Sequence, residues 1–321
     1  MKRIRATTAL AVALALSFGA QAFDLQGHRG ARGLLPENTL PSFERALDLG
    51  VTTLELDIAI TSDGVLVIHH DPTLNPAITR DASGQFLERR GPPIHSLTWA
   101  QLQTYDVGRL KPGSDYARPY PDQQPVDGTR IPRLSDLFDL VKRRGDDKVR
   151  FAIETKVRPT HPDETPAPEP FARAVVQEIR KGGMAARSQI LSFDWRTLRV
   201  VQQIAPEIPT VYLSAQQRWL DNIGADRPDG SSWTAGFQYR DHGSVPKMVK
   251  AAGGSYWSVY FGDLDAQKVK EAQSLGLKVL VWTVNDPAVM TRMVDWGVDG
   301  LITDRPDLAR KVLEGRGIRW R

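Results

Sequence analysis

Short apolar segments alternate with amphipathic segments along most of the chain. Runs rich in β-branched and apolar residues predict strands, and they occupy residues 23–26, 52–60, 149–155, 189–193, 210–213, 256–260, 278–284 and 300–303. Apolar residues at helical spacing predict helices between them, at 39–49, 134–142, 170–181, 195–204, 265–275 and 287–296. Eight strands that alternate with helices indicate an α/β fold with a parallel sheet. Eight is also the strand number of a TIM (β/α)8 barrel.

Residues that can cap a helix precede several of these helical segments. The candidates are Thr39, Ser135, Asp194, Asp263 and Asp286. Asp304 follows the last strand, and we expect it to cap a helix that starts near residue 306 rather than to take part in chemistry.

Two regions interrupt the alternation. The first begins with an extra strand at 65–69, directly after the second strand, and continues as an irregular segment at 71–133 that is rich in Pro, Gly and Arg and has one helix-like piece near 97–104. The second, at 215–243, contains Trp219, Trp233 and Phe237. Insertions after barrel strands lie on the face that carries active sites, so both are candidates to cover a substrate. An ordinary surface excursion explains each of them equally well.

The first 22 residues have the pattern of a secretory signal. Lys2, Arg3 and Arg5 precede an apolar run at 8–18 and the small-residue site Ala20-Gln21-Ala22. The run is too short to span a bilayer. We therefore expect cleavage before Phe23 and one mature domain at 23–321, with 71–133 as an inserted cap segment.

The composition indicates an oxidising compartment and gives no support for a nucleic-acid partner. The 321 residues include no cysteine, which suits an exported protein in an oxidising compartment, and a bacterial periplasm or secretion is the expected location. The net charge of +4 includes three basic residues of the signal, so the mature chain has 39 basic and 38 acidic residues and a net charge of +1. This balance gives no support for a nucleic-acid partner, and no stable membrane insertion is expected.

Acidic residues alternate with apolar ones on two neighbouring strands. In TLELDIAI, Glu55 and Asp57 share one strand face while leucines and isoleucine take the other. The apolar face would pack on helices, which turns both carboxylates into the barrel. FAIETK places Glu154 and Lys156 together in the same way. Carboxylates that converge in a low-dielectric interior suit Ca²⁺ or Mg²⁺, whereas a buried Glu–Lys ion pair with surface acids is the plainer alternative.

Histidines lie next to these acids in two motifs. GHRGARG places His28 and Arg29 among glycines that allow a ligand close to the backbone, and VLVIHHDPTL contains His69 and His70. Neighbours on an extended chain point to opposite sides, so one of the two faces the site, and alternation does not choose between them. Two imidazoles beside a metal suit phosphodiester cleavage by general acid–base catalysis. Arg29 and Lys156 would offset the charge on the phosphoryl oxygens.

The motifs HRGARGLLPENTLPSF, ELDIAITSDGVLVIHHDPTL, IETK, VWTVND and GVDGLITDRP occur in this order and resemble a glycerophosphodiester phosphodiesterase, with the bacterial exported members most similar. The resemblance implies a TIM barrel whose insertion shapes the glycerol side of the site. It implies hydrolysis of glycerophosphodiesters to sn-glycerol 3-phosphate and an alcohol, and it favours His70 over His69. The roles it implies are acid–base catalysis by His28 and His70, phosphate binding by Arg29 and Lys156, and binding of one Ca²⁺ or Mg²⁺ by Glu55, Asp57 and Glu154.

Three further residues have two interpretations each. Glu37 either supports the first-strand loop or belongs to the start of the following helix. Trp282 and Phe193, at strand ends, either line the pocket wall or fill the core.

Other functions and routes stay open at this point. A relative that acts on lysophospholipids would have the same site chemistry, and a periplasmic binding protein on the same barrel would explain the signal but not the paired histidines. A metal-dependent amidohydrolase fits less well, because His-Arg-Gly replaces the His-x-His expected after the first strand. The nucleophile is either water or the substrate's 2-hydroxyl. The head group and the oligomeric state are undetermined.

Overall fold

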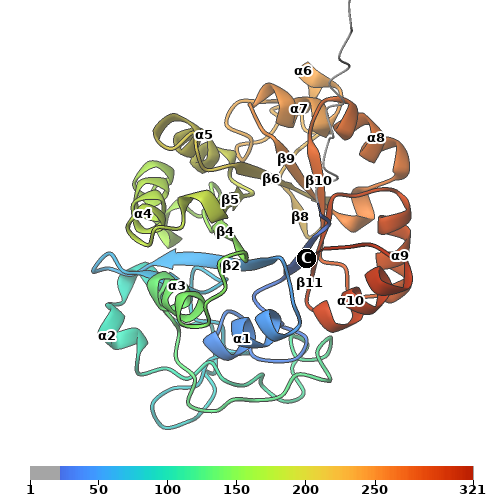
Figure 1. Cartoon of the computed structure of the whole chain (residues 1–321). Helices are drawn as coiled ribbons and strands as arrows, with labels where there is room; N and C mark the ends of the chain where they lie inside the picture. Colours follow the sequence, from blue (N-terminus) through green and yellow to red (C-terminus); the bar gives the residue numbers. More distant parts are fainter. Residues whose placement is uncertain (1–21, 321) are drawn as a thin grey trace, which may run out of the picture.

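The computed structural model of the chain describes residues 22–320 (Figure 1). All but the last residue of the predicted signal therefore lies outside the described residues. Within the described part, no helix has both the length and the apolar character needed to cross a membrane.

Eight parallel strands close into a barrel, which confirms the predicted TIM (β/α)8 fold. Each strand pairs with the next, and β1 pairs with both β2 and β11, so the sheet closes on itself. The strands are β1 (Asp24–Gly27), β2 (Thr53–Ile60), β4 (Arg150–Thr155), β5 (Ser188–Ser192), β6 (Thr210–Ser214), β9 (Tyr256–Tyr260), β10 (Lys278–Trp282) and β11 (Gly300–Thr303).

Helices surround the barrel (Figure 1). They are α1 (Leu40–Asp48), α3 (Leu134–Arg143), α4 (Pro168–Lys181), α5 (Trp195–Ile204), α7 (Val245–Ala251), α8 (Ala266–Ser274), α9 (Pro287–Asp295) and α10 (Pro306–Gly315). Thr39, Asp194 and Asp286 cap helices as predicted.

Two predicted caps are wrong. Helix α3 begins after Arg133, so Ser135 lies inside its first turn, and helix α8 is capped by Asp265. Asp263 instead accepts hydrogen bonds from Gln216 N and Gln217 Nε2, because a hairpin packs beside it.

The segment between β3 and α3 wraps one side of the barrel. Strand β3 (Leu66–Ile68) pairs antiparallel with β2, and the segment then contains η1 (Ile94–Ser96), α2 (Trp99–Leu102) and turns. It has a small apolar cluster of its own, made of Ala59, Val67, Leu74, Ile94, Leu102, Val107 and Ile131. It also meets the loop after β1, where Gln123 Nε2 donates to Arg32 O at 2.7 Å.

Shorter elements complete the other loops. The region after β6 forms the hairpin β7 (Gln216–Gln217) and β8 (Leu220–Asp221), followed by α6 (Tyr239–His242). Single 3₁₀ turns are η2 (Pro162–Glu164), η3 (Ala185–Arg187) and η4 (Phe261–Asp263). Trp219, at the tip of the hairpin, is 60% exposed.

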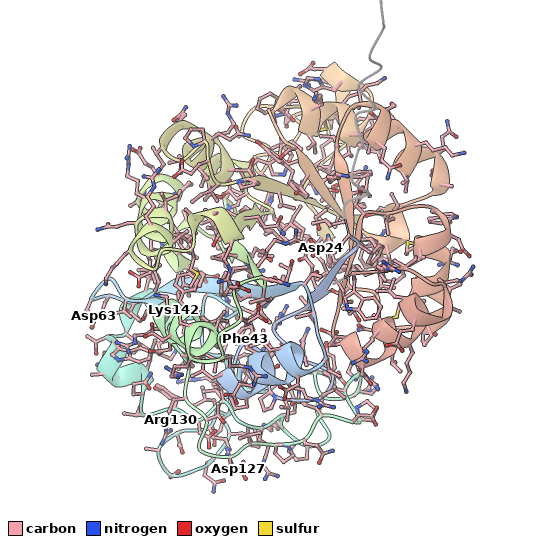
Figure 2. The ribbon with its side chains drawn as sticks, viewed as in Figure 1. Asp24, Phe43, Asp63, Asp127, Arg130 and Lys142 are labelled. Atoms are coloured by element: carbon pink, nitrogen blue, oxygen red, sulfur yellow. The ribbon has the colours of Figure 1, made fainter. Side chains whose placement is uncertain are left out.

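The core has two layers that follow from strand alternation. Leu54, Leu56 and Ile58 point outward and pack in the large cluster beneath the helices, which also includes Phe43 of α1 (Figure 2). The barrel interior is filled by a smaller cluster, Ala152, Leu191, Val211, Leu213, Leu280 and Ile302. The remaining inward positions of β2 and β4 are therefore available for charged side chains at the carboxyl end of the barrel.

The loop after β1 requires glycine at position 30, which generates a stability prediction. Gly30 has φ +88°, and a Cβ there would lie 2.6 Å from Ser42 Oγ and 2.7 Å from Ser42 C, at the start of α1. Gly84 has φ +81°, but a Cβ there would meet nothing within 4 Å. Gly84→Ala should cost about 1–2 kcal/mol for the backbone conformation. Gly30→Ala should cost about 2 kcal/mol more for overpacking, as measured by urea unfolding. Equal losses in the two variants would contradict this interpretation.

Candidate active site

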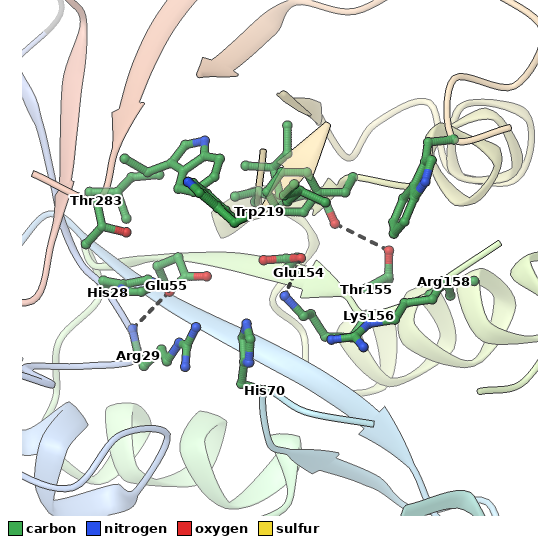
Figure 3. A pocket seen from close by; sticks show the side chains of 18 of the residues that line it. His28, Arg29, Glu55, His70, Glu154, Thr155, Lys156, Arg158, Trp219 and Thr283 are labelled. Carbon is green, nitrogen blue, oxygen red and sulfur yellow. Dashed lines mark hydrogen bonds and ion pairs between the residues drawn. The ribbon is translucent and has the colours of Figure 1, made fainter. Parts of the chain in front are cut away.

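A cavity of about 520 Å³ opens at the carboxyl ends of the barrel strands, where active sites of this fold lie. One part of its lining is charged or imidazole-bearing: His28, Arg29, Arg32, Glu55, His70, Glu154, Lys156, Arg158 and His161. Another part is aromatic: Phe193, Trp219, Trp233 and Trp282. Figure 3 shows His28 and Thr283 toward one end, Arg158 toward the other, and Glu154 between them.

Three buried carboxylates meet at the base of this cavity, and two of them, Glu55 and Glu154, line it. Glu55, Asp57 and Glu154 each offer one oxygen within 4.8 Å of the other two. The alignment of β2 with β4 brings them together, because Asp57 lies opposite Glu154 in the sheet. Burial, followed by the nearby charges of Asp57 and Glu154, raises the pKa of Glu55 well above its usual value. Burial also raises the pKa of Glu154 to about 7.

The protein's own cations balance this cluster incompletely. Lys156 Nζ lies 2.7 Å from Glu154 Oε1 and 3.5 Å from Asp57 Oδ1, and Arg29 Nε lies 3.2 Å from Asp57 Oδ2. Among the described residues, Asp57 Oδ1 has no hydrogen-bond partner although it is buried. Buried oxygen donors with an unpaired atom and a raised carboxyl pKa fit a divalent, oxygen-preferring cation.

Arg29 is fixed at the centre of the loop after β1. Its backbone N donates to Glu55 Oε2 at 2.9 Å, and its Nη1 donates to Glu37 Oε1 at 2.7 Å. Glu37 also lies 2.7 Å from Arg32 Nε and accepts from Tyr116 OH at 2.8 Å. Glu37 therefore contacts the loop arginines, while Thr39 caps the helix.

Two of the imidazoles that line the cavity, those of His28 and His70, are held in the same way. His28 Nδ1 lies 2.6 Å from Asp304 Oδ1, and Asn285 Nδ2 donates to Asp304 Oδ2 at 2.7 Å. His70 Nδ1 lies 2.7 Å from Asp71 Oδ1, and Asn75 donates to Asp71 Oδ2, also at 2.7 Å. A carboxylate on Nδ1 selects the tautomer that leaves Nε2 free to accept a proton. Each ring is thus oriented by an Asp that an Asn orients in turn.

Asp304 corrects an expectation drawn from the sequence. Helix α10 begins after Arg305, and the Asp304 side chain turns to His28 and Asn285 instead of capping the helix. The charge and hydrogen bond of His28 overcome burial and hold the pKa of Asp304 well below its usual range. The available sequence signal was its position directly after the last barrel strand, on the face that carries active sites.

The adjacent histidines separate into two environments. His70 lines the cavity, whereas His69 is buried away from the cavity lining, with its Nδ1 2.8 Å from Asp71 O. Burial, followed by the charges of Arg29 and Lys156, lowers the pKa of His70 to about 4, and burial also lowers the pKa of His28. Both shifts favour the neutral rings in the substrate-free protein, so His70 would need the negative charge of a bound phosphodiester to be protonated near pH 7.

Aromatic rings form one wall of the cavity. Trp282 contacts Phe193 edge-to-face at 5.3 Å between ring centroids, and Trp219 lies 6.2 Å from Trp282. Trp282 Nε1 donates to Ser258 O at 3.2 Å, which fixes its ring. Both predicted wall residues, Phe193 and Trp282, line the cavity, and the hairpin adds Trp219, to which the sequence assigned no individual role.

Comparisons with known proteins point to one family. The model of the Glycerophosphoryl diester phosphodiesterase family matches residues 28–308. A glycerophosphodiester phosphodiesterase of Bacillus subtilis is 29% identical over 294 residues, which cover 90% of this chain and 85% of the relative. The crystal structure of a putative glycerophosphoryl diester phosphodiesterase from Silicibacter pomeroyi is 36% identical, with a TM-score of 0.84 over 94% of this chain and 96% of that one.

A further solved structure shares the fold at lower identity. A phosphodiesterase of Oleispira antarctica, solved in complex with the product sn-glycerol-3-phosphate, is 21% identical, with a TM-score of 0.63. The alignment covers 91% of this chain and 96% of that chain.

The acidic cluster predicts pH-dependent stabilisation by a cation. The pKa of Glu154 is raised from 4.5 to about 7 in the folded protein. Glu154 therefore stabilises the cation-free fold fully below pH 4.5, and this contribution is lost as the pH rises through 7. Mg²⁺ or Ca²⁺ should therefore raise the melting temperature more at pH 8 than at pH 5. Saturation at 100 times Kd gives about 2.7 kcal/mol, or roughly 5 °C for a chain of this size. Scanning calorimetry tests this expectation, with Glu55→Gln as the variant that should lose the shift. Equal shifts at both pH values would contradict it.

Proposed function

The chain belongs to the glycerophosphoryl diester phosphodiesterase family. From this premise we propose that it hydrolyses glycerophosphodiesters to sn-glycerol 3-phosphate and an alcohol, with a divalent cation and with His28 and His70 as the acid–base pair. The observation that carries the proposal is the pair of oriented imidazoles in the same cavity as the cluster of three acids. The similarity to the Silicibacter pomeroyi protein over nearly the whole chain supports it.

Glu55, Asp57 and Glu154 would hold the cation. Their donor set of carboxylate oxygens, one of them unpaired, favours Ca²⁺ or Mg²⁺. When bound, such an ion withdraws negative charge from a phosphoryl oxygen as a Lewis acid. The ion would also offset the repulsion from Asp57 and Glu154, which together with burial raises the pKa of Glu55.

Arg29 and Lys156 would bind the remaining phosphoryl oxygens. Both line the cavity, Arg29 buried and Lys156 half-buried, and Glu37, Glu154 and Asp57 hold them in fixed positions. Fixed positive charge in a site that excludes most water stabilises the charge that develops on phosphorus-bound oxygens.

His28 and His70 would exchange protons with the reacting oxygens. With Nδ1 bonded to Asp304, His28 has Nε2 free to take the proton of the nucleophile as the P–O bond forms. The ester bond between phosphorus and the leaving alcohol breaks, and the alcohol oxygen takes a proton from His70, which is protonated and therefore charged at the start of this step. Water as the nucleophile gives the products directly. Attack by the 2-hydroxyl gives a cyclic phosphate that water then opens.

We also propose export of the mature domain. The basic and apolar N-terminal residues and the Ala20-Gln21-Ala22 site support cleavage before Phe23 and a periplasmic or secreted location. A fusion of residues 1–22 to a reporter that is active only outside the cytoplasm tests this proposal.

Phosphorus NMR tests the reaction class. The wild-type protein should convert glycerophosphocholine, glycerophosphoethanolamine or glycerophosphoglycerol to sn-glycerol 3-phosphate with Mg²⁺ or Ca²⁺, and should lose this activity with EDTA. His28→Ala and His70→Ala should each lower kcat by about 10²–10⁴-fold. His69→Ala, which alters a ring outside the cavity lining, should retain most of the activity. No turnover of any diester, or equal losses for the three variants, would reject the assignment. A transient cyclic phosphate signal identifies attack by the 2-hydroxyl.

Asp304 should control kcat through the orientation of His28. Asp304→Asn places an amide against His28 Nδ1 and favours the wrong tautomer, so kcat should fall by about 10²–10⁴-fold. KM should change little, because Asp304 bonds to His28 rather than to substrate. Asp307→Asn is the matched control, since Asp307 pairs with Arg305 outside the cavity lining. A KM effect without a kcat effect would contradict the orienting role.

A further inference from the structure

Arg32 is a buried arginine of the cavity lining to which the mechanism above gives no role. It is 8% exposed, and its guanidinium carbon lies 4.5 Å from the ring centroid of Tyr120 and 5.1 Å from that of Tyr116. Both tyrosines belong to the segment between β3 and α3. Arg32 Nε lies 2.7 Å from Glu37 Oε2, and Arg32 O accepts from Gln123 at 2.7 Å. The side chain is thus held from several directions before any ligand arrives.

The Nη atoms of Arg32 are available for a ligand. Among the described residues, neither Nη atom has a hydrogen-bond partner, although the residue lines the cavity and its Nε lies against Glu37. Two other cations of the cavity already have roles in the proposed mechanism and contact the acidic groups, Arg29 at Glu37 and Asp57 and Lys156 at Glu154. A buried guanidinium with unpaired donors is costly unless something accepts its hydrogen bonds.

We propose that Arg32 donates these hydrogen bonds to the free hydroxyl groups of the glycerol half of the substrate and is a specificity-determining residue. The proposal rests on the proposed function and names the part of the substrate that this residue recognises. It also fixes the direction in which the diester lies in the cavity.

The first argument is the spacing between Arg32 and Arg29. Both guanidinium groups flank one carboxylate, with Arg29 Nη1 2.7 Å from Glu37 Oε1 and Arg32 Nε 2.7 Å from Glu37 Oε2. Groups bound to these two neighbours must themselves be neighbours. In a glycerophosphodiester, the phosphoryl group and the glycerol hydroxyls are separated only by the carbons of one short chain.

The second argument is the position of Arg32 relative to His28. Gly33 N donates to Asp304 O at 2.8 Å, so the Arg32 loop packs against the residue that holds His28. Arg32 is therefore beside the ring that takes the proton of the nucleophile in the proposed mechanism. Arg32 can therefore reach the hydroxyls of a glycerol group that lies on the His28 side of the phosphorus atom.

The third argument is the chemical difference between the walls of the cavity. The planar fork of a guanidinium matches two adjacent oxygen acceptors and repels an ammonium group. The wall of Phe193, Trp219 and Trp282 offers ring faces, which attract apolar or cationic groups. Glycerol, a neutral diol, suits Arg32, whereas choline-like or apolar alcohols suit the aromatic wall.

Binding of two small ligands separates recognition of glycerol from recognition of phosphate. Isothermal titration with sn-glycerol 3-phosphate and with inorganic phosphate, both in Mg²⁺, is carried out on wild type, Arg32→Ala and Arg32→Lys. Arg32→Ala should weaken binding of glycerol 3-phosphate by about 10-fold or more, the effect of losing hydrogen bonds to a charged donor. The Kd of inorganic phosphate should change by less than about threefold. Arg32→Lys should be intermediate.

Arg199→Ala is the matched control, because Arg199 also packs on an aromatic ring, that of Phe237 at 5.6 Å, but lies outside the cavity lining. It should change neither affinity. Equal weakening of both ligands by Arg32→Ala, or no weakening of either, overturns the proposal, and melting temperatures identify any variant that fails to fold. Turnover of glycerophosphocholine by the wild type is measured separately. Its absence would reject the proposed function, whereas turnover without the ligand discrimination rejects only the role of Arg32.

Discussion

Burial of three carboxylates at the carboxyl end of β2 and β4 is the constraint around which the site is built. Like charges this close to one another in a low-dielectric interior are stable only with compensation. The chain supplies Lys156, the Arg29 guanidinium and backbone N–H, and an amide from Asn38 to Asp57 at 2.9 Å. The compensation is partial, and the three carboxylates could hold a divalent cation that completes it. The same imbalance that destabilises the protein therefore prepares it to bind the ion.

Each group that would touch the substrate is held by another group behind it. Asp304 and Asp71 hold the two imidazoles, and Glu37 holds both loop arginines. Such support fixes a functional geometry before the ligand binds. It also gives the segment between β3 and α3 a physical purpose, because its tyrosines close around Arg32 and Glu37 from outside the barrel. The two insertions thus support different parts of the cavity. The segment between β3 and α3 packs on Arg32 and Glu37, and the hairpin after β6 adds Trp219 to the aromatic wall.

Local pattern determined the elements and their inner faces. Alternation along β2 and β4 was sufficient to predict the strands, to turn Glu55, Asp57 and Glu154 inward and to place them together, because a strand has only two faces and parallel neighbours end at the same rim. Local pattern failed where a distant partner competes. Asp263 resembles a helix cap, yet it binds the hairpin after β6, and Asp304 resembles another, yet it turns to His28, which lies 276 residues away in the chain.

By itself, then, the sequence determined the barrel, its layers and the set of charged residues at its rim, since these follow from periodicities of a few residues. Periodicity left the choice between His69 and His70 open, the family resemblance favoured His70, and the structure shows His70 in the cavity lining. Tertiary structure alone decided that Asp304 orients His28 and that Arg32 packs on two tyrosine rings, with no hydrogen-bond partner for its Nη atoms among the described residues. These choices depend on the pairing of β1 with β11 and on the path of an irregular segment. Neither leaves a periodic trace in the sequence, because each is fixed by contacts between residues far apart in the chain.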